Sequence, residues 1–274
     1  YDLEHTVFSY IPNTAETAYF GMVEGIRKFV TDKVAESLKA GAPQEEIDRL
    51  LTLQPRVEKL MTKDAKLRTF ITADADREDL VAKVYDTTYG IIGPQDTLVV
   101  LDDSIVRGTT LRTSILRILD RLGMKKVIIV SSSPQIRFPD CYGIDMSKMA
   151  DFIAFEAAVE LIHERGLTDL LDEIYHACLA EEKRPASKSV NHVTRLFEPF
   201  SPEEISQRIG QILTPKDMNA EVEIIYQTIE GLHKACPNHT GDWYFTGDYP
   251  TPGGNRVANR SFINFMEKND ARAY

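Results

Sequence analysis

The stretch that decides the fold is LVVLDDSIVRGTT, residues 98–110. It starts as an apolar, largely β-branched run, continues into two aspartates and ends in a loop of small and polar residues. Apolar residues at helical spacing follow from Leu111 to Leu122, and Gly123 ends that pattern. Residues 127–130 form a second apolar run. Strand, helix and buried strand in this order predict an α/β fold, with a mainly parallel sheet flanked by helices.

The rest of the chain follows the same periodicities. We expect a strand at 6–11, a long helix at 14–39, a polar surface insertion at 42–66, a short strand at 68–71, and helices at 151–165, 167–182, 202–213 and 220–235. From residue 237 onward Gly, Pro, Asn and Asp dominate, which predicts mostly loop. The sequence thus predicts a domain at 1–185 and a largely helical C-terminal extension at 186–274.

The composition excludes several classes of protein. The 274 residues are 43% apolar and 27% charged, as in a soluble globular protein. The net charge of -10 and the lack of a dense basic run argue against a nucleic-acid partner. No run approaches the about 18 apolar residues of a membrane span, and the first ten residues do not resemble a leader, so we expect no membrane contact and a cytoplasmic protein. A start at Tyr1 rather than Met suggests a processed or excised fragment.

Two adjacent acids at a strand end indicate a sugar or metal site. Asp102 and Asp103 follow the first predicted strand, where parallel sheets bind their ligands. Neighbouring carboxylates repel each other unless ribose hydroxyls, a hydrated Mg²⁺ or both lie between them. The loop that follows, Ser104 to Thr110, offers backbone N–H groups, two hydroxyls and the start of a helix, which together suit a phosphate.

Acids for a sugar followed by a cradle for its phosphate describe a ribose 5-phosphate site. The structural alternative is a solvated strand end with a Thr-capped helix. The sequence contains neither G-x-x-x-x-G-K-[ST] nor a strand-linked G-x-G-x-x-G, so a nucleoside triphosphate site is not expected.

Several segments resemble a known family. LDDSIVRGTT is similar to the phosphoribosyl diphosphate motif of type I phosphoribosyltransferases, and SSSPQIRFPDCYGIDM (131–146) resembles the segment that follows it in amidophosphoribosyltransferases. IPNTAETA (11–18), LRTFI (67–71) and FTGDYPT (245–251) resemble the diphosphate loop, the mobile active-site loop and the C-terminal segment of that family.

The resemblance implies a type I phosphoribosyltransferase fold and a reaction. Ammonia displaces diphosphate from 5-phosphoribosyl 1-diphosphate with the help of Mg²⁺, which gives 5-phosphoribosylamine in the first step of de novo purine biosynthesis. The implied substrate-binding residues are Asp102, Asp103, Ser104, Arg107, Gly108, Thr109 and Thr110; the implied metal contacts are Thr14, Asp102 and Asp103; and Arg68 and Lys83 would belong to the mobile catalytic loop.

The sequence also departs from the family. The glutaminase domain begins with a nucleophilic cysteine, whereas the first cysteine here is Cys141, so we expect that domain to lie upstream in the full-length protein. Some relatives carry an iron–sulfur cluster, but Gly241 and Tyr244 occupy the expected C-x-x-C positions, and three cysteines cannot supply four thiolates, so no cluster is expected. Phe138 and Tyr142 could flank an inhibitory purine nucleotide or could pack in the core. We further expect a homo-oligomer.

Two other functions fit the same motif. One is a non-catalytic regulator that senses 5-phosphoribosyl 1-diphosphate, and the other is a salvage transferase acting on a purine base. The acid pair, the RTFI segment and the low basic content argue against the regulator, and IRFPDCYGIDM argues against the salvage enzyme.

Overall fold

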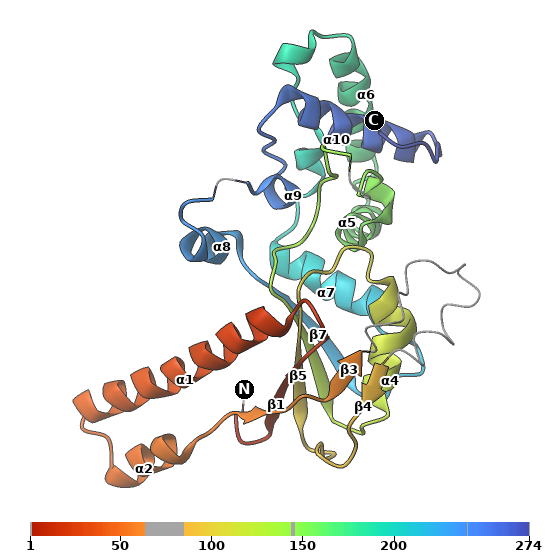
Figure 1. Ribbon diagram of the computed structural model, residues 1–274. Helices are drawn as coiled ribbons and strands as arrows, with labels where there is room; N and C mark the ends of the chain where they lie inside the picture. The colour runs from red at the N-terminus through yellow and green to blue at the C-terminus, as the bar shows by residue number, and fades with distance from the viewer. Residues whose placement is uncertain (1, 64–84, 144–145, 240, 274) are drawn as a thin grey trace. The chain divides into compact units, whose positions relative to one another are not determined.

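The computed structural model describes residues 2–63, 85–143, 146–239 and 241–273 (Figure 1). The chain packs into two compact units of discontinuous sequence. The first comprises the described residues of Tyr1–Asp103, Thr109–Ser132 and Thr214–Ile225, and the second those of Ser104–Gly108, Ser133–Leu213 and Tyr226–Tyr274.

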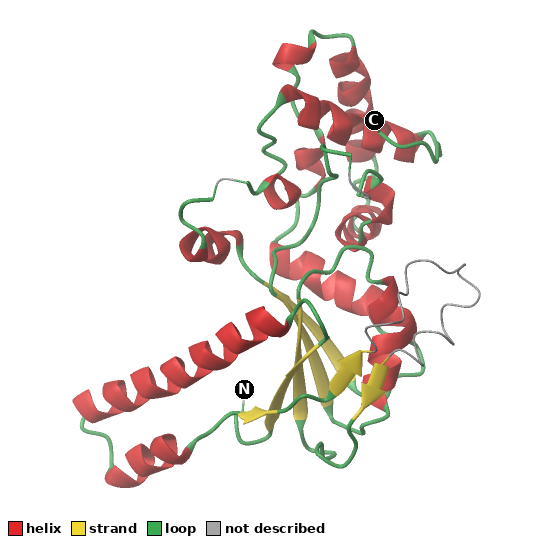
Figure 2. Cartoon of the chain, in the orientation of Figure 1, coloured by secondary structure: helices red, strands yellow, loops and turns green. Residues whose placement is uncertain are grey.

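A five-stranded sheet in the order β2-β1-β5-β6-β7 forms the centre of the first unit (Figure 2). In chain order its strands are β1 (Thr6–Tyr10), β2 (Arg56–Val57), β5 (Thr97–Asp102), β6 (Lys126–Ser131) and β7 (Glu221–Tyr226). The pairs β1–β2, β1–β5 and β5–β6 are parallel, and Val100 of β5 pairs with Ser9 on one side and Ile129 on the other. The predicted, mainly parallel sheet and its strands around the acid pair are therefore confirmed.

Helices cover both faces of this sheet, because its strands alternate between two apolar surfaces. On one face α1 (Glu16–Lys39) packs Tyr19 and Val23 against Phe8, Val99 and their neighbours. The alternate residues, such as Leu98 and Val100, are buried on the opposite face. There the π-helical turn Leu111–Ile115 continues into α4 (Leu116–Asp120), and Figure 1 shows α1 and α4 on opposite sides of the sheet.

Strand β7 corrects the prediction of a helix at 220–235. Its sequence, EVEIIY, is rich in β-branched residues and pairs beside β6, where Lys126 Nζ lies 2.8 Å from Glu221 and 2.7 Å from Glu223. Only α8 (Ile229–Ala235) of the predicted helix is helical. The prediction was wrong because a six-residue run is too short to separate the strand and helix periods.

The segment at 42–66, predicted as a surface insertion, also contributes strands and buried side chains to the first unit. It forms α2 (Gln44–Thr52), then β2 of the main sheet, then β3 (Met61–Lys63), which pairs antiparallel with β4 (Tyr85–Thr87). Leu60 and Met61 are fully buried. Residues Arg56–Val57 and Met61–Lys63 of the segment thus belong to the two sheets.

The second unit is helical. Its elements are η3 (Met149–Asp151), α5 (Ile153–Glu164), α6 (Asp169–Glu182), η4 (Ala186–Lys188), η5 (Val193–Leu196), α7 (Pro202–Leu213), α8, α9 (Trp243–Thr246) and α10 (Pro252–Met266). The predicted helices at 151–165, 167–182 and 202–213 are confirmed. The ring of Phe155 on α5 meets Phe262 and Phe265 of α10 edge to face, at centroid distances of 6.2 and 4.8 Å.

Helix α10 corrects the prediction that the tail beyond residue 237 is mostly loop. Thr251 caps the helix by accepting a hydrogen bond from the Gly254 backbone N–H, and Pro252 occupies the first turn, where its missing N–H costs nothing. Val257, Ala258, Ser261 and Phe262 then follow at helical spacing and are buried. The sequence PGGN suggested a turn, whereas here it forms the beginning of a helix.

None of the helices in the described part of the chain has both the length and the apolar composition that crossing a bilayer demands.

Replacing Phe262 by alanine tests the core of the second unit. Phe262 is fully buried, so Phe262→Ala is expected to lower the free energy of unfolding by about 3–5 kcal/mol in chemical denaturation. Phe29 on α1 is 54% exposed, and the control Phe29→Ala is expected to change that free energy by about 0.5 kcal/mol or less. Equal losses in the two variants would contradict the observed packing.

Candidate functional site

The carboxyl ends of three neighbouring strands meet at one edge of the sheet. Beyond β1, the Ile11 backbone N–H donates to the Leu101 carbonyl oxygen at 2.8 Å. Beyond β6, the Ser132 backbone N–H donates to the Asp102 carbonyl oxygen at 2.9 Å. The backbone at the end of β5 is therefore held from both sides, at the position where parallel sheets bind ligands.

The acid pair Asp102 and Asp103 projects from this edge. Asp102 is partly buried and Asp103 is exposed; the Asp103 backbone N–H donates to Asp102 Oδ1 at 2.9 Å. Removal from water raises the pKa of Asp102, and the neighbouring Asp103 carboxylate raises it further. The ionised pair is therefore destabilised among the described residues, and hydrogen-bond donors of a sugar or the charge of a cation would stabilise it.

Two residues that sequence reasoning missed act on this pair. Lys63 of β3 lies close enough for its charge to oppose the rise in the Asp102 pKa. Ser132 Oγ donates to the Asp103 carbonyl oxygen at 3.0 Å, in addition to the backbone bond to Asp102. Ser132 could have been found, because SSS directly follows the strand next to β5. Lys63 could not, because its position depends on the β3–β4 pairing.

Residues Ser104–Gly108 form an anchored loop in the second unit. Ile105 is buried, and the Val106 carbonyl oxygen accepts a hydrogen bond from the Ile153 backbone N–H at 2.8 Å. The Arg107 guanidinium forms an ion pair with Asp151 at 3.4 Å. Gly108 has φ = 68°, a left-handed conformation that favours glycine. The loop is therefore fixed by its apolar and backbone contacts, while Ser104 is only partly buried and Arg107 is exposed.

Thr109 and Thr110 begin the helical segment with exposed side chains. Thr110 occupies the N-cap position, but its backbone is already helical and its hydroxyl makes no capping hydrogen bond. The Thr109 carbonyl oxygen accepts from Thr113 Oγ1 at 2.9 Å. This geometry contradicts the alternative of a Thr-capped helix. The π-helical first turn is a geometry that occurs often at functional sites.

The remaining predicted site residues have different outcomes. Thr14 is exposed in the turn after β1, and so lies beyond the same edge of the sheet as Asp102. Arg68 and Lys83 fall within residues 64–84, outside the described part of the chain.

The segments at 131–146 and 245–251, quoted above for their family resemblance, are linked by hydrogen bonds in the second unit. Tyr249 OH donates to the Pro139 carbonyl oxygen at 2.6 Å. Just before the later segment, Tyr244 OH donates to Asp140 Oδ1 at 2.7 Å. Phe138 is buried with its ring 5.4 Å from Phe197, so it is a core residue. Tyr142 is 64% exposed.

Comparisons with known proteins agree with the motifs. No family model matches the chain. The amidophosphoribosyltransferase of Escherichia coli is 38% identical over 86 residues, which are 28% of this chain and 17% of that protein. The Saccharomyces cerevisiae enzyme of the same name is 31% identical over 135 residues, which are 46% of this chain and 26% of that protein. The Haemophilus influenzae enzyme is 39% identical over 98 residues, which are 35% of this chain and 19% of that protein. The chain is related to the amidophosphoribosyltransferases.

The relation to amidophosphoribosyltransferases covers part of each protein. The matched region spans 17% to 26% of the length of these relatives. A solved structure of glutamine phosphoribosylpyrophosphate (PRPP) amidotransferase from B. subtilis, complexed with ADP and GMP, has 24% identity and a TM-score of 0.45, over 90% of this chain and 38% of that one. The sequence relatives confirm the expected family resemblance.

Neutralising Asp102 should stabilise the protein at neutral pH. Because the pKa of Asp102 is raised in the folded state, the folded protein holds a proton that the unfolded chain releases. This effect lowers stability as the pH rises from about 4, near the ordinary carboxyl pKa, to the raised value. We expect Asp102→Asn to raise the Tm at pH 8 by about 2–4 °C, with the gain vanishing below about pH 4.

Thermal denaturation across that pH range measures the effect. Asp103→Asn, which removes only the second cause of the shift, should give a smaller gain. An Asp102→Asn protein no more stable than the parent at pH 8 would refute the electrostatic account.

Gly108→Ala tests the fit of the loop. The alanine would have to keep the left-handed φ of Gly108. Its Cβ would lie 2.4 Å from Cδ2 of Leu213, whose side chain is fully buried. The expected loss in unfolding free energy is about 2–4 kcal/mol, from backbone strain and overpacking together. Gly123 has φ = 78° with no atom within 4 Å of such a Cβ, so the control Gly123→Ala should lose only the strain, about 1–2 kcal/mol. Similar losses in urea denaturation would show that Leu213 does not constrain the loop.

Proposed function

We propose that this chain is the phosphoribosyl-transferring part of an amidophosphoribosyltransferase. In the proposed reaction, ammonia displaces diphosphate from 5-phosphoribosyl 1-diphosphate and yields 5-phosphoribosylamine. The observation that carries the proposal is the partly buried acid pair at the end of β5, with its raised Asp102 pKa, in a chain related to this family.

Each part of the motif has a role in holding the substrate. Asp102 and Asp103 accept hydrogen bonds from the ribose hydroxyls, which relieves the repulsion between the carboxylates. Ser104, Arg107, Gly108, Thr109 and Thr110 hold the 5-phosphate through hydroxyls, a guanidinium and backbone N–H groups. The exposed side chains of Thr109 and Thr110, the latter not used as a helix cap, support this assignment.

The chemistry of the donor set suits Mg²⁺. Carboxylates and hydroxyls are the hard oxygen ligands that Mg²⁺ prefers, and Asp102, Asp103 and Thr14 offer them at one edge of the sheet. Among the described residues no cluster of three or more His, Cys, Asp and Glu could enclose a metal. That fits an ion which takes further oxygens from the substrate and water. Bound there, Mg²⁺ would offset negative charge on the leaving diphosphate.

The reaction needs little covalent work from the protein. The ammonia lone pair forms the C1–N bond while the C1–O bond breaks, and diphosphate leaves with the bonding electrons. The nitrogen then loses a proton to give the neutral amine. The chain's own residues hold the ribose and its phosphate in line with the incoming nitrogen. Arg68 and Lys83 are proposed to cover the diphosphate and exclude water.

The family relation extends the proposal to the whole protein. We propose that it acts in the cytoplasm in the first step of de novo purine biosynthesis, as a homo-oligomer inhibited by purine nucleotides. A glutaminase domain upstream of this chain would supply the ammonia from glutamine. No iron–sulfur cluster is part of the proposal.

An assay of diphosphate release tests the reaction. With 5-phosphoribosyl 1-diphosphate, Mg²⁺ and ammonium, the chain should release diphosphate, and glutamine should not replace ammonium. Asp102→Asn should lower the rate by about 100-fold or more, because it removes a charged contact to the ribose. The control Asp217→Asn, an exposed aspartate that pairs with Arg117, should leave the rate unchanged.

Other outcomes would point to other functions. Binding of 5-phosphoribosyl 1-diphosphate without release under these conditions would replace the proposal with a sensing regulator. Faster transfer to hypoxanthine or adenine than to ammonia would identify a salvage enzyme.

A further inference from the structure

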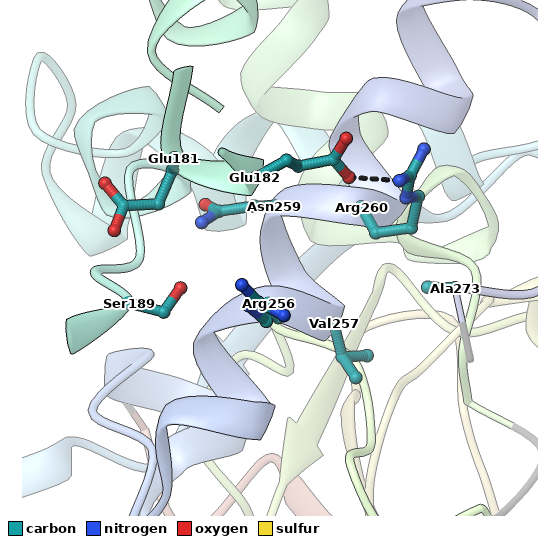
Figure 3. Close-up of a pocket in the computed structure, with 8 residues that line it drawn as sticks. All are labelled: Glu181, Glu182, Ser189, Arg256, Val257, Asn259, Arg260 and Ala273. Carbon is teal, nitrogen blue, oxygen red and sulfur yellow. Dashed lines mark ion pairs between the residues drawn. The ribbon is translucent and has the colours of Figure 1, made fainter. Parts of the chain in front are cut away.

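The second unit contains a pocket of about 270 Å³ that the proposed function does not use. Glu181 and Glu182 of α6 line it together with Ser189 and with Arg256, Asn259 and Arg260 of α10. Figure 3 shows these side chains around one space, with Glu182 and Arg260 joined by their ion pair. None of them belongs to the phosphate motif at residues 98–110.

Most of the polar groups in the wall already have partners. Glu181 is 3% exposed and accepts hydrogen bonds from Arg184 at 3.0 Å, from the Val190 backbone N–H at 3.1 Å and from His192 Nε2 at 2.9 Å. Asn259 donates to the Val190 carbonyl oxygen at 2.7 Å and accepts from the His192 backbone N–H at 3.0 Å. These contacts hold the connection between α6 and η5 against α10 and give the pocket a fixed wall.

Two donors in the wall have no hydrogen-bond partner among the described residues. Ser189 is only 6% exposed, and its hydroxyl makes no hydrogen bond. Arg256 Nη2 donates to the Arg184 carbonyl oxygen at 2.8 Å, but its buried Nε makes none. A buried polar atom without a partner costs about 1–3 kcal/mol, so two such atoms on one pocket wall favour an acceptor from outside the chain, either water or a ligand.

The charge around the pocket indicates the sign of that acceptor. Glu181 pairs with Arg184, which lies outside the lining, and Glu182 pairs with Arg260, whereas no described carboxylate forms an ion pair with Arg256, so one positive charge in the wall is unbalanced. An anion with oxygen acceptors would balance the charge and satisfy both open donors.

We propose that this pocket binds a small organic anion through a carboxylate or phosphate group. The anionic oxygens accept hydrogen bonds from Arg256 Nε and the Ser189 hydroxyl. The volume equals that of about nine water molecules, which corresponds to a ligand on the order of ten non-hydrogen atoms. The site is smaller than the pockets that hold drug-sized ligands, which begin at about 300 Å³.

Calorimetric titration of the full chain with glycerol 3-phosphate and with succinate tests the site and separates the two anion classes. At least one of them should bind, and Ser189→Ala and Arg256→Gln should each weaken that binding roughly tenfold. Ser189→Ala removes no hydrogen bond from the empty protein, so its Tm should not fall. Gln at position 256 keeps a side-chain donor for the Arg184 carbonyl oxygen.

Arg165→Gln is the matched control. Arg165 also donates to a backbone carbonyl oxygen, that of Pro199 at 3.1 Å, and pairs with Glu204 outside the pocket, so the affinity for the anion should stay unchanged. Asp102→Asn should likewise leave this affinity unchanged while it impairs the proposed transfer reaction. The proposal is overturned if neither anion binds, or if the bound anion has the same affinity for Ser189→Ala and Arg256→Gln as for the parent protein.

Discussion

The structure of the first unit depends on the in-register parallel pairing of β5 with β1 and β6. This ladder buries both faces of the strands, so polar side chains are accommodated mainly where the strands end. It also brings the ends of β1, β5 and β6 to one edge of the sheet. Of these strands, β1 and β5 are about ninety residues apart in the chain. The acid pair, Ser132 and the turn that contains Thr14 gather there as a consequence of backbone hydrogen bonding.

Both candidate sites combine a fixed backbone with an unmet electrostatic demand. At the sheet edge, two carboxylates lie side by side, and removal from water together with the neighbouring Asp103 raises the pKa of Asp102. In the helical unit, the Ser189 hydroxyl and Arg256 Nε are buried with no acceptor among the described residues. A ligand of opposite charge at either proposed site would relieve this cost, so part of its binding free energy would come from removing an unfavourable feature of the unliganded state.

The sequence was sufficient where one local pattern determines one element. The strands β5 and β6, the helix between them and the long helix α1 follow from apolar periodicity, and the acid pair follows from its place after β5. EVEIIY was mistaken for helix because short runs are ambiguous, and PGGN hid a helix start behind turn residues. Lys63 and the pair of Ser189 and Arg256 matter only through contacts between elements distant in sequence, which no local pattern encodes.

The strand β7 follows β6 in the sheet but comes much later in the chain, which has a consequence for folding during synthesis. The chain leaves the first unit at Ser132 and returns at Thr214, so β6 gains its outer neighbour only after some eighty residues of helical structure have been made. During that interval the apolar strand VIIV has one unpaired side, which is the kind of edge that recruits strands from other chains. Rapid folding of the intervening helices, whose contacts are local, would shorten the period in which a nascent chain is open to such aggregation.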